Sequence, residues 1–373
     1  MYFKNTSYRI CKESEKDGVT MKLIKESAPY IRRKADVKRM MLDVVIALTP
    51  ITIFSCVMYG WKAIYVLLIS IAIMLASEAV FVYLVNRPEY DGAKKTFKEK
   101  LKEAYSHYTI NNFLAPLISG IIYALIMPAG ARIWVVVVGA LAGIVAGKLL
   151  FGGLGSNIFN PAALGRVFAS ICFSLDYNGS NMVDIVAGGT PLAHVNGNIA
   201  NISNYKIVDL LIGTVPGAMG EGGKIAIILG GAYLLIRKSA DIRAMLSTII
   251  TFAFLMLIAG LKVDSANAIN IMLYQLLSGG LLFGAVFMVT DPVTSPTTKF
   301  GRILYGALIA SIACLIRLFG AFPEGVAFAI LIMNMFVPVI DYYKWSNSKY
   351  NYKQFVALGV IMLVIVVIIL VAL

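Results

Sequence analysis

The stretch AGGTPLA carries a hydroxyl, Thr190, beside two glycines that let another molecule approach the backbone closely. Chemistry at this threonine would have to come from outside the segment. Only His194 lies near enough in sequence to act as a base, and one histidine is weak support for a catalytic nucleophile. The alternative is a solvated threonine in an Ala-Gly-Gly turn.

A second stretch, GSNIFNP, places Asn157 and Asn160 at the joint between two apolar runs. An asparagine amide both donates and accepts hydrogen bonds, so the pair could bind a polar ligand without burying a charge. The alternative is that the asparagines cap a helix that begins near Pro161.

Two carboxylates are candidates for an ion pathway because they lie in or beside apolar runs. Glu78 is the deepest of them by residue count, although a hydrogen bond between helices would explain it equally well. Asp291 follows a glycine-rich run in the sequence TDP, which also reads as a helix end with a polar cap.

These stretches interrupt a chain that has the composition of a polytopic membrane protein. Of its 373 residues, 59% are hydrophobic and 14% are charged, which excludes an ordinary soluble domain. A spanning helix needs about 20 apolar residues. About eleven continuous runs approach that length and predict helices rather than a barrel: 41–59, 63–85, 112–128, 133–150, 160–176, 222–236, 244–261, 270–290, 303–319, 323–340 and 354–373.

The net charge of +13 is distributed in a way that predicts orientation rather than nucleic-acid binding. Lysine and arginine concentrate in the N-terminal tail, the 86–108 loop, the 237–243 turn and 344–353. All four regions fall on one side if the N-terminus is cytoplasmic. The connection 177–221 then faces outward, and Lys206 is its only lysine or arginine.

The chain divides into a polar cytoplasmic arm (1–40), a transmembrane domain (41–341) and a linker with an additional C-terminal helix (342–373). Five runs precede the outward connection and five follow it, the parity expected of two inverted five-helix halves. The tail lacks the apolar core of a cleavable signal, so we expect the first span to direct insertion. The four cysteines show no Cys-x-x-Cys spacing, which argues against an iron–sulfur or zinc site.

Five motifs occur in the order GSNIFNPAALGRVF, AGGTPLA, TVPGAMGE, VFMVTDPVTSPTT and PEGVAFAILIMNMFVPVID. Their order and approximate spacing resemble the NqrB/RnfD family. Members of that family are the flavin-carrying membrane subunits of the Na⁺-pumping NADH:quinone oxidoreductase and of the Rnf complex. The similarity runs from about Ser27 to Asp341.

The resemblance implies a covalent flavin in the outward connection. In that family, the threonine of a Ser-Gly-Ala-Thr type motif is joined to FMN through a phosphoester bond by a dedicated flavin transferase. The matching residues here are Ala187, Gly188, Gly189 and Thr190, so Thr190 is the implied attachment site. The sequence departs from the motif at Ala187 and Gly189, whereas the threonine and the Pro-Leu that follows it are kept.

A second flavin, riboflavin, is held without a covalent bond inside the membrane domain of the better-known family members. Its neighbours there match Asn157 and Asn160 of this chain. The resemblance therefore implies a riboflavin site at the GSNIFNP joint.

The implied function is that of a membrane electron-transfer subunit of a Rnf-type ferredoxin:NAD⁺ oxidoreductase that translocates Na⁺ or H⁺. Such a subunit is not catalytically complete alone, in keeping with the lack of a Gly-x-Gly-x-x-Gly fingerprint between a strand and a helix. The implied partners are the other Rnf subunits (A, B, C, E and the FMN-bearing G), the flavin transferase and the lipid bilayer, with no nucleic acid. The implied location is the prokaryotic plasma (inner) membrane.

Other interpretations stay open at this point. An NqrB-type subunit is the nearest alternative, although such subunits usually have a longer N-terminal arm and a more acidic stretch where this chain reads YTINNFLAPL. The additional C-terminal helix fits neither pattern. Broken helices also suit a channel or secondary transporter for a small solute, which leaves AGGTPLA without a role, and a purely structural scaffold explains still less.

Overall fold

The computed structural model describes residues 37–86, 97–106, 108–173, 191–192, 199, 206–320, 325–342 and 350–373. Within these ranges every regular element is a helix. The predicted all-α membrane fold is confirmed, because each of the eleven apolar runs forms a helix or a bent helix. Short helices with described bounds lie between them: α3 (Phe97–Ala104), η1 (Leu149–Phe151) and α9 (Ile207–Ile212).

The eleven runs correspond to helices whose bounds differ from the predicted ones by a few residues. They are α1 (Val37–Tyr59), α2 (Trp61–Val85), α4 (Ile110–Ile126), α5 (Ile133–Gly147), α6 (Pro161–Cys172), α10 (Lys224–Arg237), α11 (Ile242–Val263), the bent element α12 (Ala268–Leu277) with α13 (Leu281–Phe283) and η2 (Gly284–Met288), α14 (Lys299–Phe319), α15 (Val326–Ile340) and α16 (Tyr352–Ala372).

Not every predicted span is a full-length helix. Among the described residues, six helices are long and apolar enough to cross a membrane, and the bent element would make a seventh. The shorter apolar helices are α4, α6 and α15, and α10 has 14 residues. The sequence prediction of ten or eleven spans counted apolar residues that the structure places in the breaks between helices.

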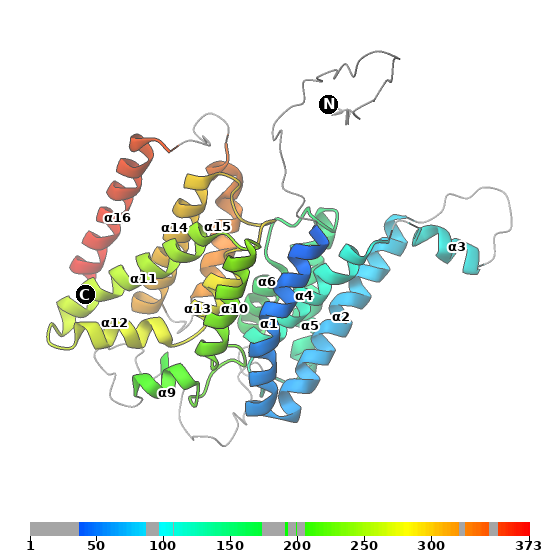
Figure 1. Cartoon of the computed structure of the whole chain (residues 1–373), viewed down its shortest axis with the longest axis horizontal. Coiled ribbons are helices and arrows are strands. Elements are labelled where there is room, and N and C mark those ends of the chain that lie inside the picture. Colours follow the sequence, from blue (N-terminus) through cyan, green and yellow to red (C-terminus); the bar gives the residue numbers. More distant parts are fainter. Residues whose placement is uncertain are drawn as a thin grey trace, which may run out of the picture.

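The helices form two sets of five that pack side by side, with α16 at one edge (Figure 1). In the first set α2 packs on α4 and α5, and α5 packs on α6. In the second set α11 packs on the α12 segment and on α14, and α14 packs on α15. The two sets meet where α1 packs on α10 and where α6 packs on α15.

The equivalent helices of the two sets run in opposite directions. The start of α1 and the end of α10 line one cavity, whereas the end of α1 and the residues before α10 line another. The start of α6 lies beside the middle of α15, where Asn334 contacts Asn160. The antiparallel pairing of α1 with α10 is the arrangement that two inverted halves require.

Glycines are found where helices are interrupted in each of the two sets. In the segment between α5 and α6, Gly152, Gly153 and Gly155 all have positive φ, a conformation that other residues rarely adopt. Within the second set the chain bends by 62° between α12 and α13. Residues at this bend have φ values that include +66° at Gly279. Irregular backbone at membrane depth needs polar partners.

Two buried basic side chains supply those partners at the second break. Lys224 donates to the carbonyl of Gly279 (2.8 Å), and Arg317 donates to the carbonyls of Gln275 (2.5 Å) and Ser278 (3.2 Å). Their positive charges lie at the C-terminal end of α12, where the helix dipole is negative. Hydrogen bonds from these two buried cations therefore tie the break to α10 and α14.

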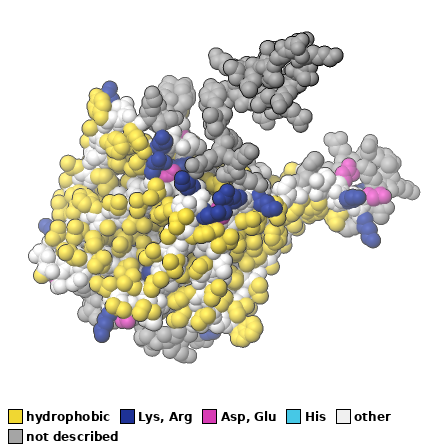
Figure 2. Space-filling model, viewed as in Figure 1, with side chains coloured by type: hydrophobic (Ala, Val, Ile, Leu, Met, Phe, Trp, Pro, Cys, Tyr) yellow, Lys and Arg dark blue, Asp and Glu magenta, His cyan; other side chains and the backbone are white. Residues whose placement is uncertain are grey.

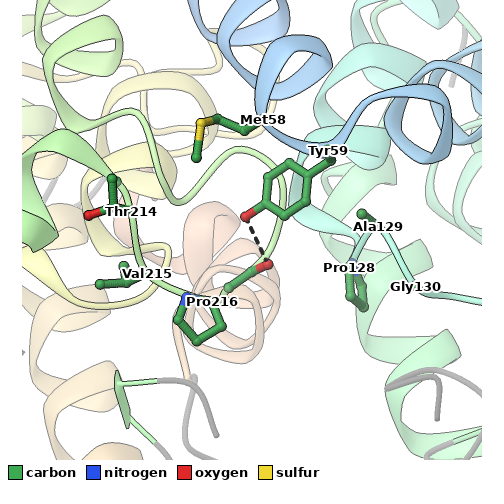
Figure 3. Close-up of a pocket in the computed structure, with 10 residues that line it drawn as sticks. Met58, Tyr59, Pro128, Ala129, Gly130, Thr214, Val215 and Pro216 are labelled. Atoms are coloured by element: carbon green, nitrogen blue, oxygen red, sulfur yellow. Dashed lines mark hydrogen bonds between the residues drawn. The ribbon is translucent and has the colours of Figure 1, made fainter. Parts of the chain in front are cut away.

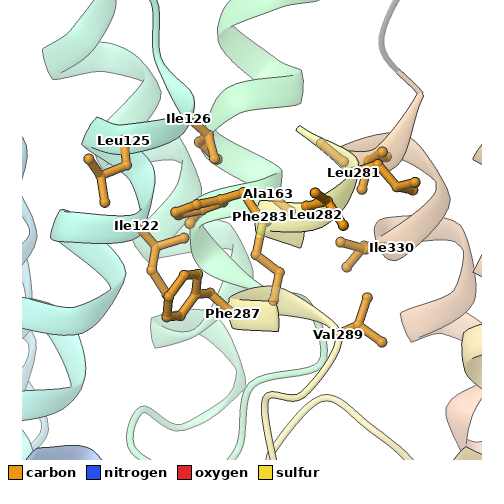
Figure 4. Close-up of a cluster of buried hydrophobic side chains, with 14 of the residues drawn as sticks. Ile122, Leu125, Ile126, Ala163, Leu281, Leu282, Phe283, Phe287, Val289 and Ile330 are labelled. Atoms are coloured by element: carbon orange, nitrogen blue, oxygen red, sulfur yellow. The ribbon is translucent and has the colours of Figure 1, made fainter. Parts of the chain in front are cut away.

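The middle of the molecule is an apolar cluster between the two sets. Figure 4 shows its side chains meeting from α4, α6, the α13–η2 segment and α15. At its centre the rings of Phe283 and Phe287 lie 5.1 Å apart. The cluster separates the two faces of the helix bundle.

The surface shows a broad apolar belt with a basic rim. In Figure 2 hydrophobic side chains cover most of the face shown, and lysines and arginines gather along its upper part, near the start of α1. Exposed residues of this rim include Lys38, Arg237 and Lys238. We call this side of the molecule the basic face, and the side that carries α9 the opposite face.

Candidate functional site

A cavity of about 410 Å³ opens on the basic face, between the two sets of helices. It is lined by the start of α1, by α4, by the end of α10 and by the two segments that follow α5 and η2. Both polar motifs GSNIFNP and TDP contribute to its wall, since Asn157, Asn160 and Asp291 all line it. The rest of the lining is mostly apolar, as is typical of sites for small molecules.

Asn157 presents an unused hydrogen-bonding group at this wall. Its amide oxygen is buried and has no hydrogen-bond partner among the residues that the structure describes. A buried acceptor without a donor costs about 1–3 kcal/mol. A ligand with an N–H or O–H group in the cavity would remove that cost, so Asn157 fits a binding role.

Asn160 has a structural role that the sequence left open. Its side-chain oxygen accepts hydrogen bonds from the backbone N–H groups of Ala162 (3.1 Å) and Ala163 (3.2 Å), and so it caps α6 ahead of Pro161. The helix-cap alternative is confirmed for this residue. Asn160 still lines the cavity, but its oxygen is committed to the helix.

The side-chain amide of Asn334, in α15, links the GSNIFNP segment to the second set of helices. When it is oriented to suit both neighbours, its oxygen accepts from the backbone N–H of Asn160 (3.0 Å) and its nitrogen donates to the hydroxyl of Tyr305 (2.6 Å). Sequence reasoning missed Asn334. The available signal was a lone amide within the apolar run ILIMNMF.

Glu78 forms an ion pair deep in the first half. Its carboxylate lies 2.8 Å from Nζ of Lys148, and the two side chains are 1% and 2% exposed. The contact is ionic, with angles outside those of a regular hydrogen bond. Sequence reasoning missed Lys148, although a lysine between an apolar run and a glycine-rich joint was a signal of a buried partner.

Asp291 caps the turn that follows η2. One carboxylate oxygen accepts from the N–H of Val293 (3.1 Å), and the other accepts from the hydroxyl of Thr294 (3.0 Å). Burial raises the pKa of this carboxyl, while the two hydrogen bonds and the charge of Lys148 act in the opposite direction. The helix-end interpretation is correct, and the side chain also faces the cavity.

The two predicted carboxylates thus belong to one charged group. Lys148 pairs with Glu78 and also interacts electrostatically with Asp291, and both Lys148 and Asp291 line the cavity. With all three residues ionised, the group carries one net negative charge. A cavity with such a wall can attract a cation and responds to any charge placed inside it.

The predicted attachment segment lies partly outside the described residues. Gly188, Gly189 and Thr190 are among those not described, whereas the next two residues, Pro191 and Leu192, are described and buried. The carbonyl of Pro191 accepts a hydrogen bond from the hydroxyl of Tyr274 in α12 (3.3 Å). This anchoring lies on the opposite face from the cavity.

The motif TVPGAMGE forms a second, much smaller pocket on the opposite face. Figure 3 shows the hydroxyl of Tyr59 donating to the carbonyl of Gly217 (3.4 Å) across this pocket. Its volume is about 30 Å³, which is enough for a water molecule and too small for an organic cofactor.

Comparisons with known proteins agree with the five motifs. The family model described as "NQR2, RnfD, RnfE family" matches residues 24–349. The D-type subunit of the ion-translocating oxidoreductase complex of Stutzerimonas stutzeri is 32% identical over 83% of this chain and 90% of its own length. The corresponding protein of Citrobacter koseri is 30% identical over 85% of this chain and 96% of its own length.

A second group of relatives matches a shorter part of the chain. The B-type subunit of the Na⁺-translocating NADH-quinone reductase of Chromohalobacter salexigens is 38% identical, over 64% of this chain and 60% of its own length. The resemblance seen in the motifs is confirmed by these matches. The chain belongs to the NQR2, RnfD, RnfE family.

Proposed function

We propose that this protein is the flavin-carrying electron-transfer subunit of a Rnf-type ferredoxin:NAD⁺ oxidoreductase. The coarser statement, a multi-pass membrane subunit of an ion-translocating oxidoreductase complex, follows from the family and from the relatives that bear that name. The observation that supports the flavin-carrying part is the cavity with the unsatisfied oxygen of Asn157, on the face opposite to the anchored residues that follow Thr190.

Coverage favours the D-type protein over the B-type protein. The D-type relatives match 90% and 96% of their own length, whereas the B-type relative matches 60% of its length. The B-type interpretation has its own support in the higher identity of 38% over the shared region. It is the second candidate, with a quinone as the electron acceptor of the complex.

The cavity suits the second flavin, a riboflavin. Its volume falls in the range of about 300–1,000 Å³ that is usual for small-molecule sites. The amide oxygen of Asn157 can accept a hydrogen bond from the ring, and Lys148 and Asp291 place charge at the same wall. When bound, a flavin accepts electrons and passes them on, while the protein sets its position and its electrostatic surroundings.

Thr190 is the proposed site of the covalent FMN. The segment that follows it is fixed to α12 on the face with few basic residues, which the positive-inside rule places outside the cytoplasm. We infer an N-terminus in the cytoplasm of a prokaryote and a flavin on the outer side of its plasma membrane. The FMN-bearing G protein of the complex is the proposed electron donor at that side.

Ion translocation would depend on the charged group at the cavity. Glu78, Lys148 and Asp291 carry an uncompensated negative charge when all are ionised, so adding electrons next to them favours uptake of a cation. Either Na⁺ or H⁺ satisfies this argument. NAD⁺ and ferredoxin would bind other subunits.

The test is in-gel fluorescence of the denatured chain after expression with its flavin transferase. We expect a fluorescent band for the natural sequence and none for Thr190→Ala. Acid extraction of the folded Thr190→Ala protein should then release riboflavin from the cavity. A dark band for the natural sequence, with the transferase active on a known substrate, would refute the covalent flavin, and an extract without flavin would refute the second site.

A further inference from the structure

The two residues that follow Thr190 occupy a pocket made by the break between α12 and α13. Leu192 is 7% exposed and lies against Gly279, where an added Cβ would come within 2.6 Å of the leucine Cδ1 atom. The hydroxyl of Tyr274, one turn earlier in α12, donates to the carbonyl of Pro191. The segment is thus held by one polar and one apolar contact with the same helix and its C-terminal break.

The break itself is held by two buried cationic side chains. Lys224 reaches it from α10 and Arg317 from α14, and together they bind three carbonyls at the end of α12 and just beyond it. The guanidinium of Arg317 also lies 4.9 Å from the ring centroid of Phe252. Three helices therefore fix the surface against which Leu192 packs.

We propose that this break is a seat that positions the flavin-bearing segment, with Tyr274 and Gly279 as positioning residues. The inference rests on the proposed function at Thr190. Electron exchange between two flavins weakens steeply with their separation, so a flavin on a free loop would meet its partner in many ineffective arrangements. Anchoring the chain at the residues next to the attachment point reduces that freedom.

Gly279 is essential to the seat for two reasons. Its φ of +66° disfavours any other residue, and a side chain there would displace Leu192. The chain offers a matched control in Gly60, which has a φ of +58° and no atom within 4 Å of an added Cβ. Gly279→Ala and Gly60→Ala therefore both place a Cβ on a residue with positive φ, but only the Cβ at Gly279 would meet Leu192 Cδ1 (2.6 Å) and Arg317 Nη2 (3.1 Å).

The first readout is the fluorescence anisotropy of the covalent flavin in the full chain, with Thr190→Ala protein as the background. We expect Gly279→Ala to lower the anisotropy and Gly60→Ala to leave it at the natural value. A Leu192→Ala variant should behave like Gly279→Ala, and Leu192→Met should restore the natural value because it refills the same space.

A second pair of variants tests the polar contact without changing a glycine. Tyr274→Phe removes the hydroxyl that binds the carbonyl of Pro191. Tyr123→Phe removes an equally buried hydroxyl that donates to the carbonyl of Val136 (3.2 Å) in the first half. Hydrogen–deuterium exchange of the peptide that contains Leu192 should become about tenfold faster in Tyr274→Phe, the change expected for one lost hydrogen bond. It should not change in Tyr123→Phe.

The outcomes distinguish a failure of the positioning role from a failure of the proposed function. Unchanged anisotropy in Gly279→Ala, or unchanged exchange in Tyr274→Phe, overturns the seat even when the flavin is attached. If Gly279→Ala fails to fold, the comparison of Tyr274→Phe with Tyr123→Phe still tests the positioning role. A natural chain without covalent flavin refutes the proposed function, and the positioning role falls with it.

Discussion

The asparagines of GSNIFNP have different roles although they share a chemical type. Asn160 gives its oxygen to the first turn of α6, whereas Asn157 lines the cavity and its buried side-chain oxygen has no hydrogen-bond partner among the described residues. We expect Asn157→Ala to lose most of the extractable riboflavin without lowering the stability of the flavin-free chain. Asn160→Ala should lower the free energy of unfolding by about 1 kcal/mol, the usual value of a helix cap. Flavin extraction and thermal unfolding of both variants would check this, and flavin loss in neither would contradict the assigned site.

The buried carboxylate of Glu78 depends on its ion pair with Lys148. Replacing Lys148 with methionine keeps the volume and leaves the carboxylate buried without its partner, which costs about 3–5 kcal/mol. The double variant Lys148→Met with Glu78→Gln should regain most of that loss, since no bare charge remains. Thermal unfolding of the two single variants and the double variant gives the coupling energy. A coupling near zero would show that the pair is not formed.

At the scale of elements, the helices were predictable and their contacts were not. The apolar runs are long and continuous, so their helical form follows from the backbone's need for internal hydrogen bonds in lipid. The breaks were also visible as glycine-rich joints. The partners of the breaks, Glu78 of α2 for Lys148 at the first break and Arg317 of α14 for the end of α12, come from helices distant in sequence. No local pattern states which helices are neighbours.

The same reasoning explains which site residues could be found. Asn157 and Asp291 lie in the breaks, where a polar residue is conspicuous against apolar flanks. Asn334 lies in the middle of a helix, and its role depends on contacting both Tyr305 and Asn160. A lone amide in an apolar helix has many possible partners, and only the packed structure selects one.

The turn between α10 and α11 gives a prediction for an element outside the membrane-spanning segments. Asp241 caps α11 through the N–H of Arg243 (2.8 Å), and it pairs with the guanidinium groups of Arg243 and Arg302. Burial alone would raise the pKa of Asp241, but the hydrogen bonds and positive charges outweigh it and lower the pKa below its usual value. The pairing therefore stabilises the fold above the pKa of the unfolded chain.

As the pH falls below about 4, protonation of Asp241 should remove this contribution progressively. Asp241→Asn keeps an acceptor for the cap and removes the charge, at a cost of about 1 kcal/mol at neutral pH. We expect the difference in unfolding temperature between the natural chain and Asp241→Asn to shrink on acidification. A difference that stays constant down to about pH 3, below the usual pKa of an aspartate, would show that the ion pairs contribute nothing.

At the scale of the whole molecule, the two proposed flavin sites belong to different faces. The cavity opens on the basic face, and the seat of Pro191 and Leu192 lies on the opposite face, with the apolar cluster around Phe283 and Phe287 between them. Inverted halves produce this arrangement naturally, because each half begins on the face where the other ends. Electrons entering at one face and leaving at the other would then cross the membrane within one subunit.

This arrangement requires the bent element α12–η2 to cross the membrane rather than to enter and return on one side. Ser265 is exposed in the turn before α12, and Lys299 is exposed at the start of α14. In a chain with Cys11, Cys56, Cys172 and Cys314 replaced by alanine, we expect a membrane-impermeant maleimide to label Ser265→Cys in intact spheroplasts. Lys299→Cys should react only after permeabilisation, because the basic face is predicted to be cytoplasmic. Labelling of both from outside would make the element a re-entrant loop, and the reverse pattern would place Thr190 in the cytoplasm.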